Sequence, residues 1–413
     1  MIITILERLC LFYKGYNFEF GYQNKDYKIM KSDRRNFIKN SLSLTAGLTI
    51  AELNSYAGFS KKKILNKIPK IIKWPVVEGP DTPKLCVGGS TNADEKQMQL
   101  IKQMGVDYVL MGGPRIPWKV EDLRTIMDKY RENGLTVINM MIGGHNNAIY
   151  GREGRDEEIA KVKESIVAAG AASLPVIEYN WYVDRLMEGY YEKKGRGGTG
   201  VTAYDYAPVK NLPAKPEIGT YTAEQIWDNI TYFLNAVIPV AEKAGVRLAL
   251  HPNDPPASIS HGSPQIMATY EGWKRLLDIV KSPANGMTYD PGVCREMGLD
   301  PVDVLHYIGS RDQINHAHYR NVTTQEPYNK YEEVFFDSGE VNMFAVMQEF
   351  FKVRYTRGIY PEHPRFFTID TEFPGYVAGR GYPGGGGNTG QVFNVAYARA
   401  MMQAVQSYQP MPE

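Results

Sequence analysis

Two kinds of hydrophobic pattern alternate along the chain from about residue 84 onward. Short runs rich in β-branched and aromatic residues are followed by longer stretches in which apolar residues recur every three or four positions. The short runs predict eight strands, at 84–87, 108–111, 136–141, 174–179, 247–251, 286–290, 313–318 and 366–370. The longer stretches predict helices at 94–104, 120–133, 157–169, 223–244, 270–281, 301–308, 342–354 and 391–406.

The stretch 223–244 shows the helical pattern most clearly. Its apolar residues form one stripe along a helix, namely Ile226, Ile230, Phe233, Leu234 and Val237. Thr222 is suited to cap the amino end, and Gly245 is suited to end the helix.

Eight strands in strict alternation with helices predict an α/β fold, a (β/α)₈ TIM barrel with right-handed crossovers. The alternative is a doubly wound open sheet, which would carry a glycine-rich phosphate turn after its first strand. Residues 86–90, CVGGS, lack that turn. The stretches 190–219 and 374–390 are interpreted as long loops over the barrel mouth, and the four glycines at 384–387 as part of a flexible lid or crossover.

The composition is that of a globular protein and gives no indication of a polyanion partner. Of 413 residues, 43% are hydrophobic, and 47 Lys and Arg balance 46 Asp and Glu, which argues against nucleic-acid binding. The three cysteines, Cys10, Cys86 and Cys294, exclude a disulfide framework, although one bridge between Cys86 and Cys294 remains open. We expect one catalytic domain over 60–413, and the sequence leaves a homo-oligomer open.

The first 59 residues are read as a targeting segment. Arg34 and Arg35 precede an apolar, small-residue run at 41–51 and the small-x-small site SYA at 55–57, which is typical of a twin-arginine export signal. The run is too short to span a bilayer, so we expect a periplasmic mature chain without membrane insertion, or a cytoplasmic one if the signal is not used. Met30 directly precedes the signal, so either Met1 or Met30 fits as the start.

Metal-capable side chains end the last four predicted strands. They are His251, Asp290, His318 and either Asp370 or Glu372. The carboxyl ends of barrel strands meet at one rim, so these residues would converge despite their separation in sequence. Mixed imidazole and carboxylate ligands suit Mn²⁺, Fe²⁺, Zn²⁺ or Co²⁺. Taken singly, each histidine could instead be structural and Asp290 could be a turn former.

Two neighbours of His318 extend this interpretation. Alternation along a strand places His316 on the same face, below His318 and further from the rim. Arg320 would project over the same mouth, where it could grip a substrate carboxylate with two parallel hydrogen bonds or form a surface salt bridge.

Several motifs of the sequence resemble the mannonate dehydratase family, within the xylose isomerase-like barrels. They are YNW at 179–181, IPVAE at 238–242, HPNDPP at 251–256, SPANG at 282–286, HYRN at 318–321 and GEVNM at 339–343. The likeness runs over about 95–408, and its specific motifs are concentrated in the second half.

The resemblance implies a divalent metal, Mn²⁺ or Fe²⁺, bound through a histidine, a cysteine, a second histidine and an aspartate. Carried onto this chain, the ligands are His251, Asp290, His318 and Asp370. Asp290 replaces the cysteine, which makes the ligand set harder. Thr371 stands where the family has a histidine with an acid-base role, and Asn253 stands where an aspartate is usual.

The activity that the resemblance implies is removal of water from a sugar acid, a D-mannonate-like aldonate, to give a 2-keto-3-deoxy product. Proton transfer would fall to Glu372, Tyr376 or Tyr382. The residues expected to contact the substrate are Arg320, Asn180, Trp181 and Asn253.

Two further functions stay open on the sequence. A metal-dependent sugar isomerase or epimerase would use the same ligands, and Glu178 would then serve as a ligand or base. An exported sugar-binding barrel would need Trp118 and Trp181 for stacking but no complete set of metal ligands.

Overall fold

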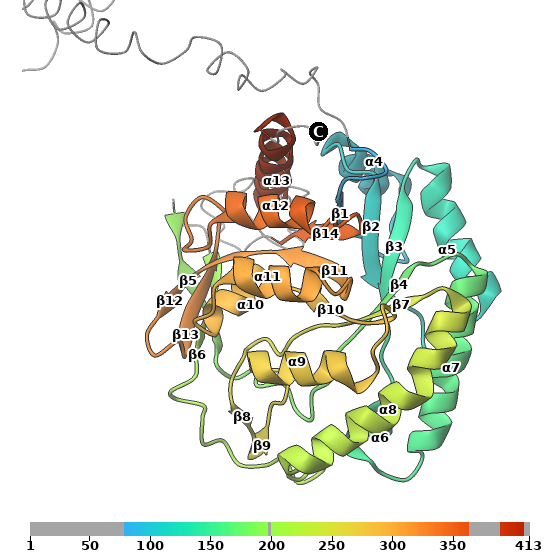
Figure 1. Ribbon diagram of the computed structural model, residues 1–413, viewed down its shortest axis with the longest axis vertical. Helices are drawn as coiled ribbons and strands as arrows, with labels where there is room; N and C mark the ends of the chain where they lie inside the picture. The colour runs from blue at the N-terminus through green and yellow to red at the C-terminus, as the bar shows by residue number, and fades with distance from the viewer. Residues whose placement is uncertain (1–77, 197–199, 363–388, 409–413) are drawn as a thin grey trace, which may run out of the picture. The chain divides into compact units, whose positions relative to one another are not determined.

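A closed barrel of eight parallel strands forms the centre of the protein (Figure 1). The computed structural model describes residues 78–196, 200–362 and 389–408. Around the barrel the strands follow the order β1-β14-β11-β10-β7-β4-β3-β2. Their bounds are β1 Lys84–Gly88, β2 Tyr108–Gly112, β3 Thr136–Met141, β4 Val176–Tyr179, β7 Arg247–Leu250, β10 Asn285–Tyr289, β11 Ile314–Tyr319 and β14 Gly358–Pro361. The predicted TIM barrel is therefore confirmed.

Helices follow the barrel strands at the eight places where the helical periodicity predicts them. The helices are α4 Glu95–Gln103, α5 Val120–Glu132, α6 Asn146–Tyr150, α7 Arg155–Ala171, α8 Ala223–Ala244, α9 Tyr270–Ile279, α10 Pro291–Glu296, α11 Pro301–Gly309, α12 Met343–Lys352 and α13 Thr389–Tyr408. The short helices α6 and α10 were not predicted. The apolar stripe of α8 is buried, including Ile230, Phe233 and Val237. Its ends also match the prediction, because Thr222 forms a capping box with Gln225 and Gly245 adopts a left-handed conformation with φ 69°.

The eighth barrel strand does not lie where the hydrophobic pattern placed it. β14 pairs with β11 on one side and with β1 on the other, and so closes the barrel. The predicted strand at 366–370 lies outside the described residues, and its predicted place as the eighth barrel strand is taken by β14. β14 has only four residues, Gly-Ile-Tyr-Pro, and its identity depends on two partners that are distant in sequence.

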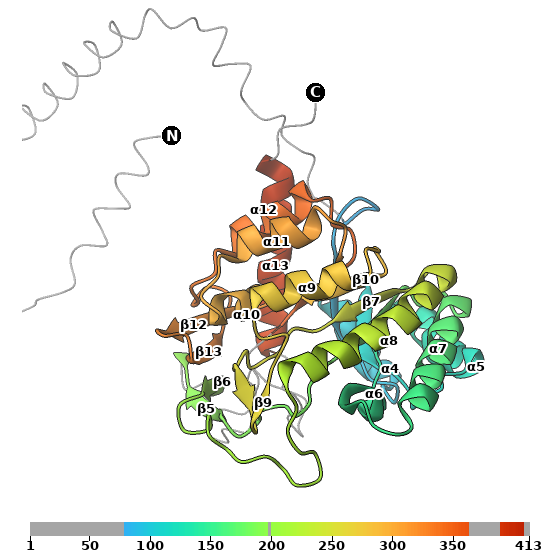
Figure 2. The ribbon, with the colours of Figure 1, turned by 60° about the horizontal axis from the view of Figure 1, so that its bottom comes forward.

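A four-stranded antiparallel sheet forms from segments that lie between barrel strands in the chain. It is separate from the closed sheet of the barrel (Figure 2). Its strands, in order, are β12 Asn321–Gln325, β13 Lys330–Val334, β6 Gly200–Asp205 and β5 Tyr190–Lys194. A two-stranded ribbon, β8 Ile259–Ser260 and β9 Ser263–Pro264, follows β7. The interpretation of 190–219 as a loop was therefore wrong for β5 and β6, which pair with each other, while β6 also pairs with the distant β13.

The remaining sequence-based expectations on architecture have different outcomes. Cys86 and Cys294 are both buried and free, so the bridge left open by the sequence does not form. Among the described residues, no helix is both long enough and apolar enough to cross a bilayer. The export segment, the 59/60 boundary and most of the stretch 374–390 lie outside the described residues, so those predictions stay predictions.

Candidate metal centre and active site

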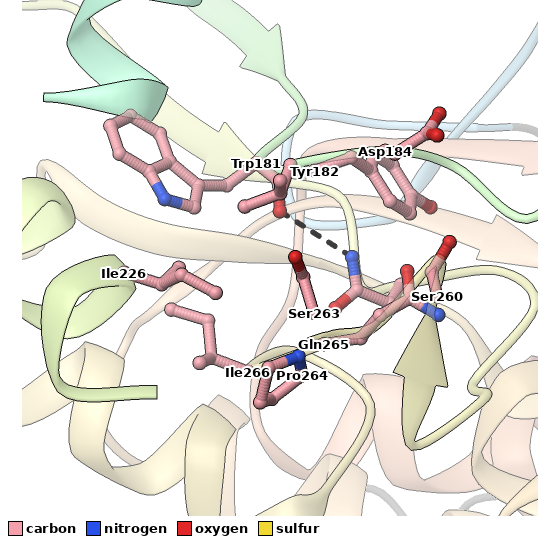
Figure 3. A pocket seen from close by; sticks show the side chains of 11 residues that line it. Trp181, Tyr182, Asp184, Ile226, Ser260, Ser263, Pro264, Gln265 and Ile266 are labelled. Atoms are coloured by element: carbon pink, nitrogen blue, oxygen red, sulfur yellow. Dashed lines mark hydrogen bonds between the residues drawn. The ribbon is translucent and has the colours of Figure 1, made fainter. Parts of the chain in front are cut away.

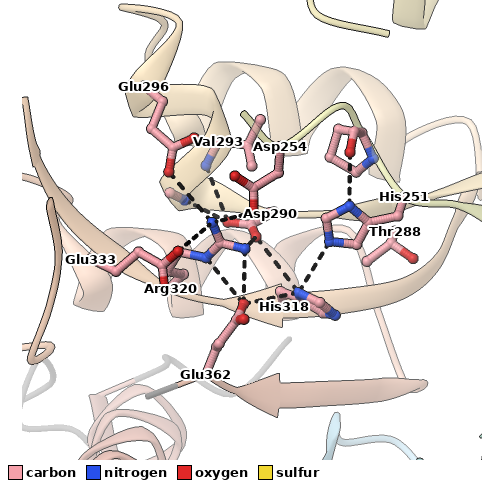
Figure 4. A network of polar contacts seen from close by, with 12 residues as sticks. His251, Asp254, Thr288, Asp290, Val293, Glu296, His318, Arg320, Glu333 and Glu362 are labelled. Carbon is pink, nitrogen blue, oxygen red and sulfur yellow. Dashed lines mark hydrogen bonds and ion pairs between the residues drawn. The ribbon is translucent and has the colours of Figure 1, made fainter. Parts of the chain in front are cut away.

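Four strand ends bring ionisable side chains together at one rim of the barrel (Figure 4). His251 follows β7, Asp290 follows β10, His318 lies near the end of β11, and Glu362 follows β14. All four are at most 8% exposed. The Nδ1 atom of His318 lies 3.1 Å from Glu362 Oε2, 3.6 Å from Asp290 Oδ2 and 3.4 Å from His251 Nε2.

The ring of His251 is oriented by its own backbone. Its Nδ1 lies 2.8 Å from the carbonyl oxygen of Pro252, which fits an N–H donated to that carbonyl. This bond leaves the Nε2 lone pair directed at the site, the usual arrangement of a metal-binding histidine. Burial, and then the charge of His318, lower the pKa of His251. The ring is therefore neutral at neutral pH, the form that binds metals.

Asp290 serves two purposes. It is the N-cap of α10, with Oδ1 accepting hydrogen bonds from the backbone N–H of Gly292 at 2.8 Å and of Val293 at 3.2 Å. The turn-forming role left open by the sequence is thus present. Its buried Oδ2 accepts no well-aligned hydrogen bond and faces His318, so the same residue also offers an oxygen ligand.

The electrostatic field at this rim favours positive charge. Burial alone would lower the pKa of His318, but the carboxylates of Glu362, Asp290 and Glu178 outweigh it and raise the pKa to about 10. His316 lies on the same strand, with its ring centroid 5.7 Å from that of His318. Burial lowers the pKa of His316 to about 4, so it is a neutral residue packed beside the site, as expected.

The residues of this rim form two overlapping sets that could hold a cation. Ligand atoms of Glu178, His251 and His318 lie within 4.8 Å of one another, and so do those of Asp290, His318 and Glu362. Imidazole nitrogens with carboxylate oxygens form the donor set that suits Mn²⁺, Fe²⁺ or Zn²⁺. The buried Oδ2 of Asp290 has no well-aligned hydrogen bond, although Arg320 Nη2 lies 2.9 Å away, and such an atom could also bind a cation.

Glu362 is a site residue that sequence reasoning missed. The sequence placed the fourth ligand, an acid, at Asp370 or Glu372, both of which lie outside the described residues. Because β14 is the eighth barrel strand, the acid at its end is Glu362. A signal was present, since Glu362 follows the short run Gly-Ile-Tyr-Pro, but the stronger β pattern at 366–370 masked it.

The structure places Arg320 differently from the expectation. The residue is 1% exposed, and its guanidinium lies among acidic side chains (Figure 4). The contacts run to Asp254 Oδ2 at 2.9 Å, Asp290 Oδ2 at 2.9 Å, Glu362 Oε2 at 3.0 Å, Glu296 Oε1 at 3.4 Å and Glu333 Oε1 at 3.8 Å. A substrate carboxylate would have to displace these partners. Arg320 is therefore a buried counter-charge that orients the acidic groups. The sequence had suggested instead that it binds a substrate carboxylate or forms a surface salt bridge.

Trp181, Trp118 and Asn253 are also buried too deeply for the contacts expected of them. Trp181 is 1% exposed and lines a small pocket with Ile226 and Ile266 (Figure 3). Trp118 is 3% exposed, and its indole N–H donates to the Pro114 carbonyl. Asn253 is 1% exposed, and its Oδ1 accepts from the backbone N–H of Met267 at 2.9 Å. Their positions indicate structural roles.

Two adjoining pockets open beside the metal-capable residues. The first, of about 140 Å³, is lined by Glu178, His251, His318 and Glu362 together with Asn180, Tyr182, Arg185, Asp254, Leu110, Met141 and Tyr360. The second, of about 410 Å³, shares Met141, Asn180 and Tyr182 with it. Asn180 thus lies where a substrate would bind, and its substrate contact stays a prediction. Sequence reasoning missed Arg185, which no motif singles out.

The proton-transfer residues proposed from the sequence are not placed. Glu372, Tyr376 and Tyr382, like Thr371, lie outside the described residues. Their roles stay predictions.

Known proteins resemble this chain in sequence. A family model described as D-mannonate dehydratase (UxuA) matches residues 217–411. A mannonate dehydratase of Streptococcus pneumoniae is 31% identical over 287 residues, which cover 63% of this chain and 78% of that protein. One of Thermotoga petrophila is 28% identical over 325 residues, or 68% of this chain and 89% of the relative.

Solved structures show the same fold. The crystal structure of mannonate dehydratase from Streptococcus suis serotype 2 superposes with a TM-score of 0.68 at 24% identity, covering 80% of this chain and 97% of that one. A xylose isomerase domain protein from Alicyclobacillus acidocaldarius superposes with a TM-score of 0.50 at 11% identity, covering 79% and 99%. With its barrel, its rim of histidines and acids, and these relatives, the chain belongs to the mannonate dehydratase family.

Proposed function

We propose that the protein is a metal-dependent hydro-lyase that removes water from a D-mannonate-like aldonate and releases a 2-keto-3-deoxy-aldonate. The observation that carries the proposal is the meeting of two imidazoles and two carboxylates, from His251, Asp290, His318 and Glu362, at four strand ends beside a pocket. Family membership supplies the reaction class.

The proposed metal is Mn²⁺ or Fe²⁺, and the proposed ligands are His251, Asp290, His318 and Glu362. A bound divalent cation supplies Lewis-acid polarisation of the substrate's carboxylate and hydroxyl oxygens. The carbonyl of Pro252 holds the ring of His251 so that the Nε2 of His251 faces the site. The backbone N–H of Gly292, at the start of α10, holds Asp290 through its Oδ1. Arg320 restrains Asp290 and Glu362 from the other side, at 2.9 Å and 3.0 Å.

The net reaction requires one base and one acid. The base takes the proton from the carbon next to the carboxylate, and the acid protonates the hydroxyl that leaves from the following carbon as water. The resulting enol becomes the 2-keto-3-deoxy acid. If Glu362 is the fourth ligand, the residue after it in the sequence is His363. The position after the fourth ligand then holds a histidine, as it does in the family. Thr371 is in that case no longer a difference from the family. We assign proton transfer to His363, with Glu372, Tyr376 and Tyr382 as the remaining candidates.

A sugar isomerase or epimerase is the second candidate, and Glu178 favours it. Glu178 is 1% exposed, accepts from Asn139 Nδ2 at 2.8 Å and Thr288 Oγ1 at 2.9 Å, and belongs to one of the two cation-binding sets. A carboxylate held in this way could serve as ligand or base on a neutral sugar.

One experiment separates the candidates. The protein, reconstituted with Mn²⁺ or Fe²⁺, is incubated with a panel of aldonates, aldoses and ketoses, and products are identified by mass and NMR. Loss of one water from an aldonate, with a 2-keto-3-deoxy product, supports the lyase. Interconversion of neutral sugars at constant mass overturns it in favour of the isomerase. Binding without turnover overturns both and supports the sugar-binding barrel.

We also propose that the chain is exported through its twin-arginine segment. The support is the order of Arg34, Arg35, the apolar run 41–51 and the small-x-small site at 55–57. Fractionation of cells that express the full chain, beside the double variant Arg34→Lys/Arg35→Lys, tests it. Wild-type protein in the periplasm and the variant in the cytoplasm are expected, whereas equal cytoplasmic retention of both would overturn the proposal.

A further inference from the structure

The pocket beside the metal-capable residues has an acidic wall. Three of its lining residues, Glu178, Asp254 and Glu362, are carboxylic acids, and all three are buried. An aldonate brings a further negative charge into this space. Carboxylate–carboxylate repulsion in a partly buried pocket is costly unless a cation lies opposite the incoming group.

Arginine and lysine are scarce in this lining. Among the described residues that line the pocket, Arg185 is the one with a permanently cationic side chain, and the adjoining pocket contributes neither arginine nor lysine from the described part of the chain. Arg320, which the sequence suggested for this role, is 1% exposed and lies among carboxylates. The side chain of Arg185, by contrast, keeps 32% of its surface exposed, although its Nη2 lies 3.9 Å from Asp254 Oδ2.

Arg185 is also held in place before any substrate arrives. Its Nε donates to the backbone carbonyl of Asp254 at 2.7 Å. Its guanidinium carbon lies 5.7 Å from the ring centroid of Tyr182 and 5.9 Å from that of Tyr190. A guanidinium positioned in this way loses little side-chain entropy on binding, and its planar fork of donors matches a carboxylate.

From these observations we infer that Arg185 binds the substrate carboxylate and makes the pocket selective for sugar acids over neutral sugars. The inference rests on the proposed function and deepens it, because it names the group that recognises the acid. The carboxylate would lie within the 140 Å³ pocket, and the carbon chain would extend past Met141, Asn180 and Tyr182 into the 410 Å³ pocket that shares these residues.

The test compares Arg185→Met and Arg185→Lys with a matched control, Arg155→Met. Arg155 has a similar side-chain exposure of 37% and stacks 4.1 Å from the ring centroid of Tyr232, but it lies in α7, away from both pockets. Turnover of D-mannonate gives kcat and KM. Binding of D-mannonate and of mannitol, its uncharged alditol counterpart, to metal-free protein is followed by ligand-observed NMR.

We expect Arg185→Met to raise KM for mannonate by about 10- to 100-fold, the range for a lost charge-assisted pair. The variant should weaken mannonate binding by a similar factor and leave mannitol binding unchanged. Arg185→Lys should have a KM and a mannonate affinity between those of wild type and Arg185→Met. Arg155→Met should match wild type. Equal loss of both ligands, or no loss for mannonate, overturns the inference. If wild type turns over no aldonate at all, the proposed function fails, while a selective loss of mannonate binding would still support the role of Arg185.

Discussion

The imidazole of His318 and the carboxylate of Glu362 face each other with Nδ1 and Oε2 3.1 Å apart, although 44 residues separate them in the chain. The two side chains stand at the ends of neighbouring barrel strands, since His318 pairs in register with Tyr360 of β14. This pairing makes Glu362 the fourth ionisable group of the set formed with His251, Asp290 and His318.

Replacing Glu362 with glutamine should therefore remove a metal ligand. Loss of a supporting group around a metal ligand weakens binding by roughly 10–100-fold, so we expect Glu362→Gln to weaken Mn²⁺ binding by at least about 100-fold. Asp370→Asn, at the position suggested by sequence, should leave the affinity unchanged. Titration of metal-free protein with Mn²⁺ by EPR measures both. A large loss of Mn²⁺ affinity in Asp370→Asn, with none in Glu362→Gln, would identify Asp370 as the ligand instead.

His363 provides a second test of the same assignment. General acid-base groups contribute about 10²- to 10⁴-fold to rate, so His363→Asn should lower kcat by at least about 100-fold while metal content stays at the wild-type level. Thr371→Val serves as the control and should retain activity. Metal analysis and steady-state kinetics measure these two quantities. Full activity of His363→Asn would exclude His363 from proton transfer.

Arg320 should contribute strongly to stability. Its removal would leave Asp254, Asp290 and Glu362 buried without their counter-charge, and such a loss costs about 3–5 kcal/mol. We expect Arg320→Met to lower the free energy of unfolding by that amount in urea denaturation. Glu296 is a matched control from the same cluster. Burial and the neighbouring Asp254 raise the pKa of Glu296 well above its ordinary value, which favours its protonated form. Glu296→Gln, which resembles the protonated acid, should change stability by less than about 1 kcal/mol.

His145 should make the fold sensitive to acid. It stacks on Phe233, with ring centroids 5.5 Å apart, and burial lowers its pKa from 6.5 to about 4. The unfolded chain takes up the proton first, so this contribution to stability is complete above about pH 6.5 and is lost as the pH falls toward 4. Its size is at most about 3 kcal/mol.

The variant His145→Phe isolates this contribution. As the pH falls from 7 to 4.5, the free energy of unfolding should decrease more for the wild type than for His145→Phe. A difference that does not change with pH would contradict the prediction.

The sequence by itself determined the features that depend on local pattern. Seven of the barrel strands, the span of α8 with its caps at Thr222 and Gly245, and the placement of His251, Asp290 and His318 at strand ends all follow from periodicity and capping, which act over a few residues. The family resemblance rests on motifs around these same strand ends.

Only the tertiary structure decided the features that depend on distant partners. β14 is recognisable as the eighth strand because β11 and β1 pair with it, and this pairing makes Glu362 a site residue. Arg320 and Arg185 differ in their surroundings because Arg320 is buried among five acidic side chains and Arg185 is partly exposed in the pocket wall. Burial and counter-charge come from chain segments far apart in sequence, so no local pattern could distinguish the two arginines.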